Sequence, residues 1–311
     1  MFGILGSVDE HYNHFMATLY TQASNNRYKT WLLMTGFLVA VIALGWYFGL
    51  VLDLAYLLPL AIVFSLVMNV ASYWWSDKIV LKMSGARPVE REEFHDFYTV
   101  TENLAIAAGL PLPKLYVIDD PSPNAFATGR DKEHAVVAVT TGLLEVLERN
   151  ELEGVVAHEL AHIGNRDILL QTVVVVLVGF VALLSDFFIR SSLFGGGNRD
   201  SKAGGYLIII GIGLALLAPI SATLIQLAIS RKREFLADAS GALLTRYPEG
   251  LARALEKISA SGRPVQRASN ATAHMYIMSP FGAGGRRAVH KLFMTHPPVE
   301  ERLAALRGLN L

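Results

Sequence analysis

A short pattern in this 311-residue chain has the residue types and the spacing of a catalytic metal site. His158, Glu159 and His162 form an H-E-x-x-H pattern, which on a helix puts both imidazole rings on one face, one turn apart. Two ring nitrogens can then bind one metal ion. The Glu159 carboxylate can reach a metal-bound water and act as general base without binding the metal itself. A chance match is expected in roughly one such chain per hundred, so the pattern needs a third ligand in a suitable context.

The third ligand is expected in an acidic segment near residue 234. The chain has no cysteine, so a zinc ion must be bound by His, Asp or Glu side chains. Glu234 and Asp238 are four residues apart and share a helix face, so Glu234 can bind the metal while Asp238 accepts the other ring N–H of a ligand histidine. The alternative is an acidic pair that balances the basic residues 231–233 on a solvated face. We prefer the ligand interpretation because it supplies both the third ligand and the histidine's partner.

Four apolar runs divide the chain, and each is long enough to cross a membrane as a helix. Hydrophobic residues make up 52% of the sequence and charged residues 17%, which is too apolar for an ordinary soluble domain. A spanning helix needs about twenty apolar residues. A cleaved signal is the alternative for the first run, and a pair of buried core helices is the alternative for the last two. We predict four transmembrane helices, at residues 31–51, 54–75, 168–189 and 206–229.

The segments between these runs are expected to form the catalytic part. Residues 115–118 and 135–139 have the composition of short strands. The predicted fold class is therefore a mostly α-helical (α+β) membrane protein with a zincin-like catalytic domain that contains a small β-sheet. The predicted order is a polar N-terminal segment (1–30), a transmembrane hairpin (31–75), the first part of the catalytic domain (76–167), a second hairpin (168–229) with a flexible loop (190–205), and the second part of the catalytic domain (230–311).

The predicted spans place the catalytic residues on one side of the membrane and close to it. The basic residues that flank the spans are more numerous on that side, which predicts the cytoplasmic face. His162 precedes the third run by six residues and Glu234 follows the fourth by five, so the metal is expected near the lipid bilayer surface. Membrane proteins, or unfolded polypeptides brought to the bilayer, are the expected substrates. The formal net charge is zero, so no nucleic-acid partner is expected, and no pattern in the sequence indicates an oligomeric state.

Taken together, these features resemble the HtpX-type membrane zinc metalloproteases, a branch of the gluzincins related to the CAAX prenyl proteases. The resemblance covers most of the chain. It rests on the first hairpin, on the stretch N-A-F-A-T-G at 124–129, on the two metal-binding segments, and on T-H-P-P at 295–298 with Arg302. The first 30 residues depart from the family, which usually enters the membrane almost at once; they are expected to form an interfacial helix or a disordered tail.

The resemblance implies zinc-dependent proteolysis of misfolded membrane proteins at the cytoplasmic face of the bacterial inner membrane, in stress response and protein quality control. It also implies that His158, His162 and Glu234 are the zinc ligands. In such enzymes the stretch that begins with Asn124, Ala125 and Phe126 forms a sheet edge that pairs with the extended substrate. From the local sequence alone, a simple turn after Pro123 is the alternative.

Two further residues receive roles in this interpretation. His296 precedes two prolines and is the best candidate to stabilise the oxyanion that develops on the attacked carbonyl; a structural hydrogen bond is the alternative. Arg302 is assigned to the substrate-binding region, or alternatively to an ion pair with Glu301. Two rival functions are an intramembrane metalloprotease and a membrane scaffold or transporter without catalysis.

Overall fold

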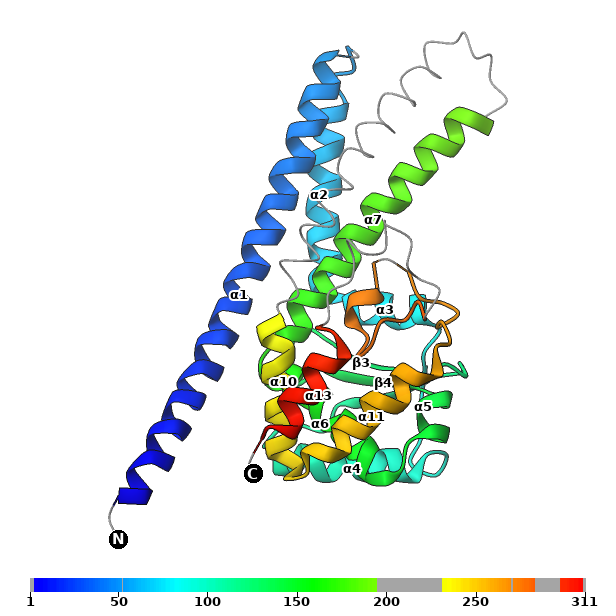
Figure 1. Ribbon diagram of the computed structural model, residues 1–311. Coiled ribbons are helices and arrows are strands. Elements are labelled where there is room, and N and C mark those ends of the chain that lie inside the picture. Colours follow the sequence, from blue (N-terminus) through cyan, green and yellow to red (C-terminus); the bar gives the residue numbers. More distant parts are fainter. Residues whose placement is uncertain (1–2, 52, 195–230, 270, 283–296, 310–311) are drawn as a thin grey trace.

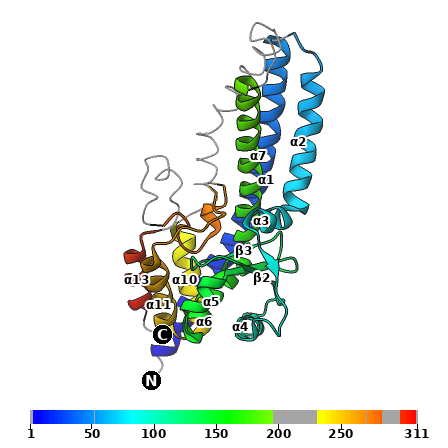
Figure 2. The ribbon, with the colours of Figure 1, turned by 90° about the vertical axis from the view of Figure 1, so that its right-hand side faces the viewer.

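The computed structural model describes residues 3–51, 53–194, 231–269, 271–282 and 297–309. Three long helices rise from a globular part (Figures 1 and 2): α1 (Gly3–Val51), α2 (Leu57–Trp74) and α7 (Asp167–Phe194). The globular part contains the helices α3 (Ser76–Ser84), α4 (His95–Ala107), α5 (Thr141–Val146), α6 (Arg149–Gly164), α10 (Arg231–Thr245), α11 (Pro248–Ser261) and α13 (Val299–Arg307), the 3-10 turn η1 (Ala273–Met275), and the strands β1 (Arg87–Pro88), β2 (Lys114–Ile118), β3 (Ala125–Thr128) and β4 (Val136–Thr140).

Two of the long helices have the length and hydropathy of a membrane span, at Asn25–Val51 within α1 and at Leu57–Trp74. A third span is counted if α6 and the first part of α7, which meet at 84°, are taken as one broken span. Among the described residues the structure therefore supports a membrane protein with two spans, or up to three. The predicted fourth run and most of the predicted loop 190–205 lie outside the described residues.

Two predicted boundaries differ from the structure. Residues 3–30 belong to the same continuous helix α1 as the first span, and not to a separate interfacial helix or a tail. The reason is that no glycine or proline interrupts the sequence between Gly6 and Gly36. Helix α7 likewise runs to Phe194, past the predicted start of the loop at residue 190, because the glycine run begins only at Gly195.

The small sheet has the strand order β1-β2-β4-β3, and β3 lies at an edge. Strands β2 and β4 correspond to the two predicted strands and are parallel, while β1 and β3 are antiparallel to their neighbours. Alternate residues of a strand face opposite sides, and both sides are buried here. Val117 and Val137 belong to the hydrophobic cluster that includes α4 and α6, whereas Phe126 and Ala138 belong to the cluster that includes α7. The sheet therefore lies between the motif helix α6 and the base of the long helices.

Helices α1 and α2 pack closely at Gly45, and this contact gives a first prediction. A Cβ atom at Gly45 would lie 2.3 Å from the Ala61 Cβ, whereas a Cβ at Gly36 in the same helix would meet nothing within 4 Å. We expect Gly45→Ala to lower the free energy of unfolding in detergent by about 1–3 kcal/mol, because overpacking forces the helices apart. Gly36→Ala is the matched control and should cause no loss. Equal stability of the two variants, measured by thermal unfolding, would contradict the close packing.

Candidate active site

The H-E-x-x-H segment lies on α6, which is buried on most of its faces. A capping box fixes the start of α6. The Glu148 side chain accepts a hydrogen bond from the backbone N–H of Glu151, and the Glu151 side chain accepts one from the backbone N–H of Glu148. Helix α10 approaches the backbone of α6 very closely at Gly241, where an added Cβ would lie 3.0 Å from the backbone nitrogen of His158. Glycine at this position therefore allows α10 to bring Glu234 and its neighbours next to the histidine rings.

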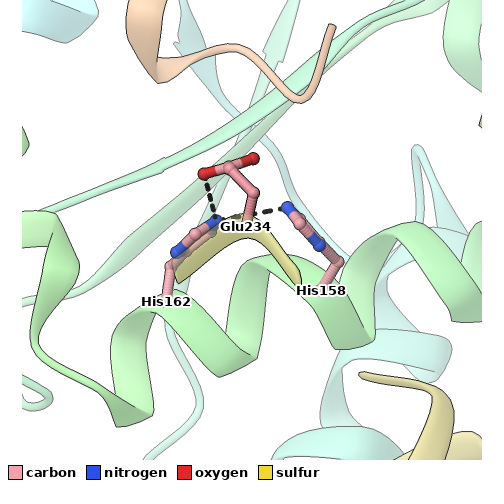
Figure 3. Close-up of side chains that lie close together, drawn as sticks. All are labelled: His158, His162 and Glu234. Carbon is pink, nitrogen blue, oxygen red and sulfur yellow. Dashed lines mark hydrogen bonds and ion pairs between the residues drawn. The ribbon is translucent and has the colours of Figure 1, made fainter. Parts of the chain in front are cut away.

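His158, His162 and Glu234 converge on one point (Figure 3). The two histidines project from α6 and Glu234 from α10, and all three side chains are buried. The Nε2 atoms of the histidines are 3.2 Å apart, and Nε2 of His162 is 3.6 Å from Oε1 of Glu234. Ligand atoms of a tetrahedral zinc ion with bonds near 2.0–2.1 Å are separated by about 3.3 Å. The donor set and its spacing therefore fit a zinc ion.

The outer nitrogens of both histidines face carboxylates. Nδ1 of His158 lies 2.9 Å from Oδ1 of Asp238, and Nδ1 of His162 lies 3.0 Å from Oδ2 of Asp167. A carboxylate at Nδ1 keeps the hydrogen there and leaves the Nε2 lone pair for a metal. The two carboxylates therefore orient both rings so that their Nε2 atoms point to one place, as ligands of a single metal ion require.

Asp167 is a site residue that the sequence interpretation missed. On a continuous helix, a residue five positions after His162 would point about 140° away from it. The chain instead turns at Arg166, which has a positive φ of 57°, and Asp167 begins α7 on the side of the imidazole. The available sequence signal was an acidic residue directly before an apolar run, but only the turn brings its carboxylate to the His162 ring.

Arg302 holds Asp238 in place. Its side chain is fully buried, and its Nε and Nη2 donate to the two Asp238 oxygens at 2.8 Å and 2.6 Å. Nη1 donates to the Ile277 carbonyl oxygen at 2.8 Å. Burial alone would favour the neutral acid, but Arg302 outweighs it and keeps the pKa of Asp238 below its ordinary value. The partner of Arg302 is therefore Asp238 rather than Glu301, and its buried position suits orientation of Asp238 rather than contact with a substrate.

Glu159 lies beside the edge strand of the sheet. Its side chain is 1% exposed, and this burial is the main reason that its pKa is raised to about 7. The backbone N–H of Ala127, in β3, faces the Glu159 carboxylate and lowers its pKa slightly. A carboxylate that titrates near neutral pH can both accept and return a proton, which is what a general base in hydrolysis requires.

The stretch that starts at Asn124 is a strand at the sheet edge rather than a simple turn. Its first residues already bind the segment 276–278 of the same chain. The Asn124 amide donates to the Met278 carbonyl at 3.1 Å, and the Ala125 carbonyl accepts the Ile277 N–H at 2.9 Å. The ring of Phe126 packs against Tyr276, with centroids 5.2 Å apart. These three residues are buried.

Ala127 is the next residue whose backbone faces away from β4. Asn124 directs its backbone toward Thr140 of β4, and the direction alternates along the strand, so Ala125 and Ala127 face outward. The outward-facing Ala127 C=O, next to Glu159, is suited to accept a hydrogen bond from an extended peptide. His296 lies outside the described residues.

The chain is similar in sequence to known proteins. Residues 91–310 match the model of peptidase family M48. The protease HtpX homologue of Caldanaerobacter subterraneus subsp. tengcongensis is 47% identical over 303 residues, which cover 94% of this chain and 99% of that protein. The protease HtpX homologue of Tropheryma whipplei is 43% identical over 291 residues, with 94% and 98% covered. The crystal structure of S. mikatae Ste24p aligns with a TM-score of 0.47 and 20% identity over 93% of this chain and 67% of that one, which is too distant to inform the site.

Proposed function

The chain belongs to peptidase family M48 as an HtpX-type metalloendopeptidase, and we propose that its metal is zinc, bound by His158, His162 and Glu234. The observation that carries this proposal is the convergence of three buried ligand atoms within 4.8 Å of one another. The carboxylates at Nδ1 of both histidines support it, because such partners fix the tautomer that binds a metal.

The reaction follows from the positions of the side chains around this point. A bound zinc ion supplies a Lewis acid that polarises the substrate carbonyl and lowers the pKa of a water molecule to about 7. Glu159 accepts the proton of the attacking water and returns it to the leaving amine nitrogen. His296 stabilises the oxyanion in this proposal, on the basis of its sequence context alone.

The substrate binds as an extended chain along β3 in this proposal. Because Ile277 already occupies the Ala125 carbonyl, pairing with the substrate is centred on Ala127. Backbone hydrogen bonds of this kind are independent of side-chain identity, so the enzyme should tolerate many sequences around the cleaved bond.

The substrates are misfolded membrane proteins cut close to the bilayer. Asp167 begins α7 only five residues after His162, so the metal site lies at the foot of a long apolar helix. The loop that follows β3 reaches the end of α2, where the Arg130 guanidinium lies 4.8 Å from the Trp74 ring centroid. Trp74 and Trp75 are about half exposed there, as expected for aromatic residues at a membrane interface. The cytoplasmic orientation rests on the basic residues that flank the spans.

This proposal is tested with purified protein in liposomes. We expect a single zinc ion per chain, loss of cleavage on chelation, and recovery on addition of zinc. The substrate should be one unfolded polypeptide prepared with and without a transmembrane anchor, and the anchored form should be cut faster. Folded protein that holds no zinc and cuts neither form would contradict the zinc site. Cleavage of short soluble peptides with the anchored form left intact would contradict the substrate class.

A further inference from the structure

Asn26 connects the N-terminal helix to the candidate metal centre. It lies in α1, at the second residue of the apolar span, and its side chain is 1% exposed. The Nδ2 atom donates to Oδ1 of Asp167 at 2.6 Å and to the Asn165 carbonyl at 3.2 Å. The Oδ1 atom accepts a hydrogen bond from Nη1 of Arg233 at 3.2 Å. Asn26 therefore contacts both the α6–α7 turn and the start of α10.

Asp167 is the residue that joins this contact to a metal ligand. Its Oδ1 accepts from Asn26 and, at 3.2 Å, from Nη1 of Arg233. Its Oδ2 lies 3.0 Å from Nδ1 of His162. The carboxylate is 1% exposed, and in such a place its orientation is set by protein partners rather than by water. One oxygen is held by Asn26 and Arg233, which leaves the other directed at the imidazole.

An asparagine is suited to this position because it offers a donor and an acceptor together. The donor end faces the Asp167 carboxylate and the acceptor end faces the Arg233 guanidinium. An aspartate of the same shape would place a second negative charge 2.6 Å from Asp167, and a leucine would leave the buried Asp167 oxygen without this donor. Arg233 directly precedes Glu234 in the sequence. By accepting a hydrogen bond from Arg233, the same asparagine also holds the residue next to a second ligand.

We infer that Asn26 is a positioning residue of the metal site, which acts through Asp167 to fix the His162 ring. The first 30 residues, which the sequence left without a role, therefore include a part of the active centre. Because α1 is one continuous helix from Gly3 to Val51, the same element that enters the membrane also orients a zinc ligand. This inference rests on the proposed zinc site.

The test is metal affinity rather than activity. Asn26→Leu keeps the approximate shape of the side chain and removes both hydrogen-bonding groups. Loss of an outer partner of a ligand histidine lowers metal affinity by about 10–100-fold; we expect about a tenfold rise in the zinc Kd in a chelator competition, and a changed visible spectrum of the Co²⁺-loaded protein. Asn25→Leu is the matched control, because Asn25 is the adjacent residue and is exposed. It should bind Zn²⁺ and Co²⁺ as the natural protein does.

A double-mutant cycle with Asp167→Asn shows whether Asn26 acts through Asp167. If it does, Asn26→Leu should weaken zinc binding no further once Asp167 is replaced. Additive losses, or a natural zinc Kd and cobalt spectrum in folded Asn26→Leu, would overturn the inference. If Asn26→Leu does not fold, Asn26→Ser replaces it, since serine is too short to reach Asp167. A natural protein without zinc overturns the proposed function and this inference together, whereas zinc bound equally by natural protein and variant overturns this inference alone.

Discussion

Glu159→Gln should lower peptide-bond cleavage by about 10²–10⁴-fold and leave the zinc content unchanged. Glutamine has nearly the same shape as glutamate and can still face the Ala127 N–H, but it cannot take a proton from water. Glu159 is adjacent to a ligand in sequence without belonging to the converging ligand set, so metal binding should survive the change. Zinc content and cleavage of an unfolded substrate, measured on the same preparation, test both parts of this result.

The matched control for this variant is Glu153→Gln. Glu153 lies on the same helix, is about one-third exposed, and pairs with Arg149 across one helical turn at 3.4 Å. The substitution is the same glutamate-to-glutamine change, made away from the proposed zinc site, so the Glu153→Gln protein should retain natural activity. If the Glu159→Gln protein binds zinc and still cleaves at the natural rate, Glu159 is not the general base.

Arg302→Met should strongly destabilise the folded protein and weaken its zinc binding. It leaves the Asp238 carboxylate buried without its bidentate partner, and loss of one member of a buried ion pair costs about 3–5 kcal/mol. Asp238 should then take up a proton, because burial raises its pKa once the guanidinium is gone. Since Asp238 faces Nδ1 of His158, zinc affinity should also fall by about 10–100-fold.

Denaturant unfolding of the metal-free protein measures the first effect, and chelator competition measures the second. Arg307→Met is the control, since Arg307 lies on the same helix α13 and makes exposed ion pairs with Glu249 and Glu256. It should show neither effect, because exposed ion pairs contribute little to stability. If both arginine variants unfolded alike and bound zinc alike, Arg302 would have no positioning role.

The sequence alone determined the features that depend on near neighbours in the chain. The H-E-x-x-H spacing needs only the 3.6-residue helical period to place both imidazoles on one face. Strands β2 and β4 follow from short local runs of apolar, aromatic and β-branched residues, and the first two spans follow from the length of their apolar runs. Glu234 and Asp238 could be paired with the motif because their four-residue spacing is also a helical one.

Only the tertiary structure decided which distant residues hold the ligands in place. Asp167 follows His162 closely in sequence, but it reaches the imidazole only because the chain turns at Arg166. The partners Asp238 and Arg302 are 64 residues apart, and Asn26 and Asp167 are 141 residues apart. No local period relates such pairs, since their contact depends on how whole helices pack: α10 approaches α6 where Gly241 has no side chain, and α1 extends alongside the turn between α6 and α7.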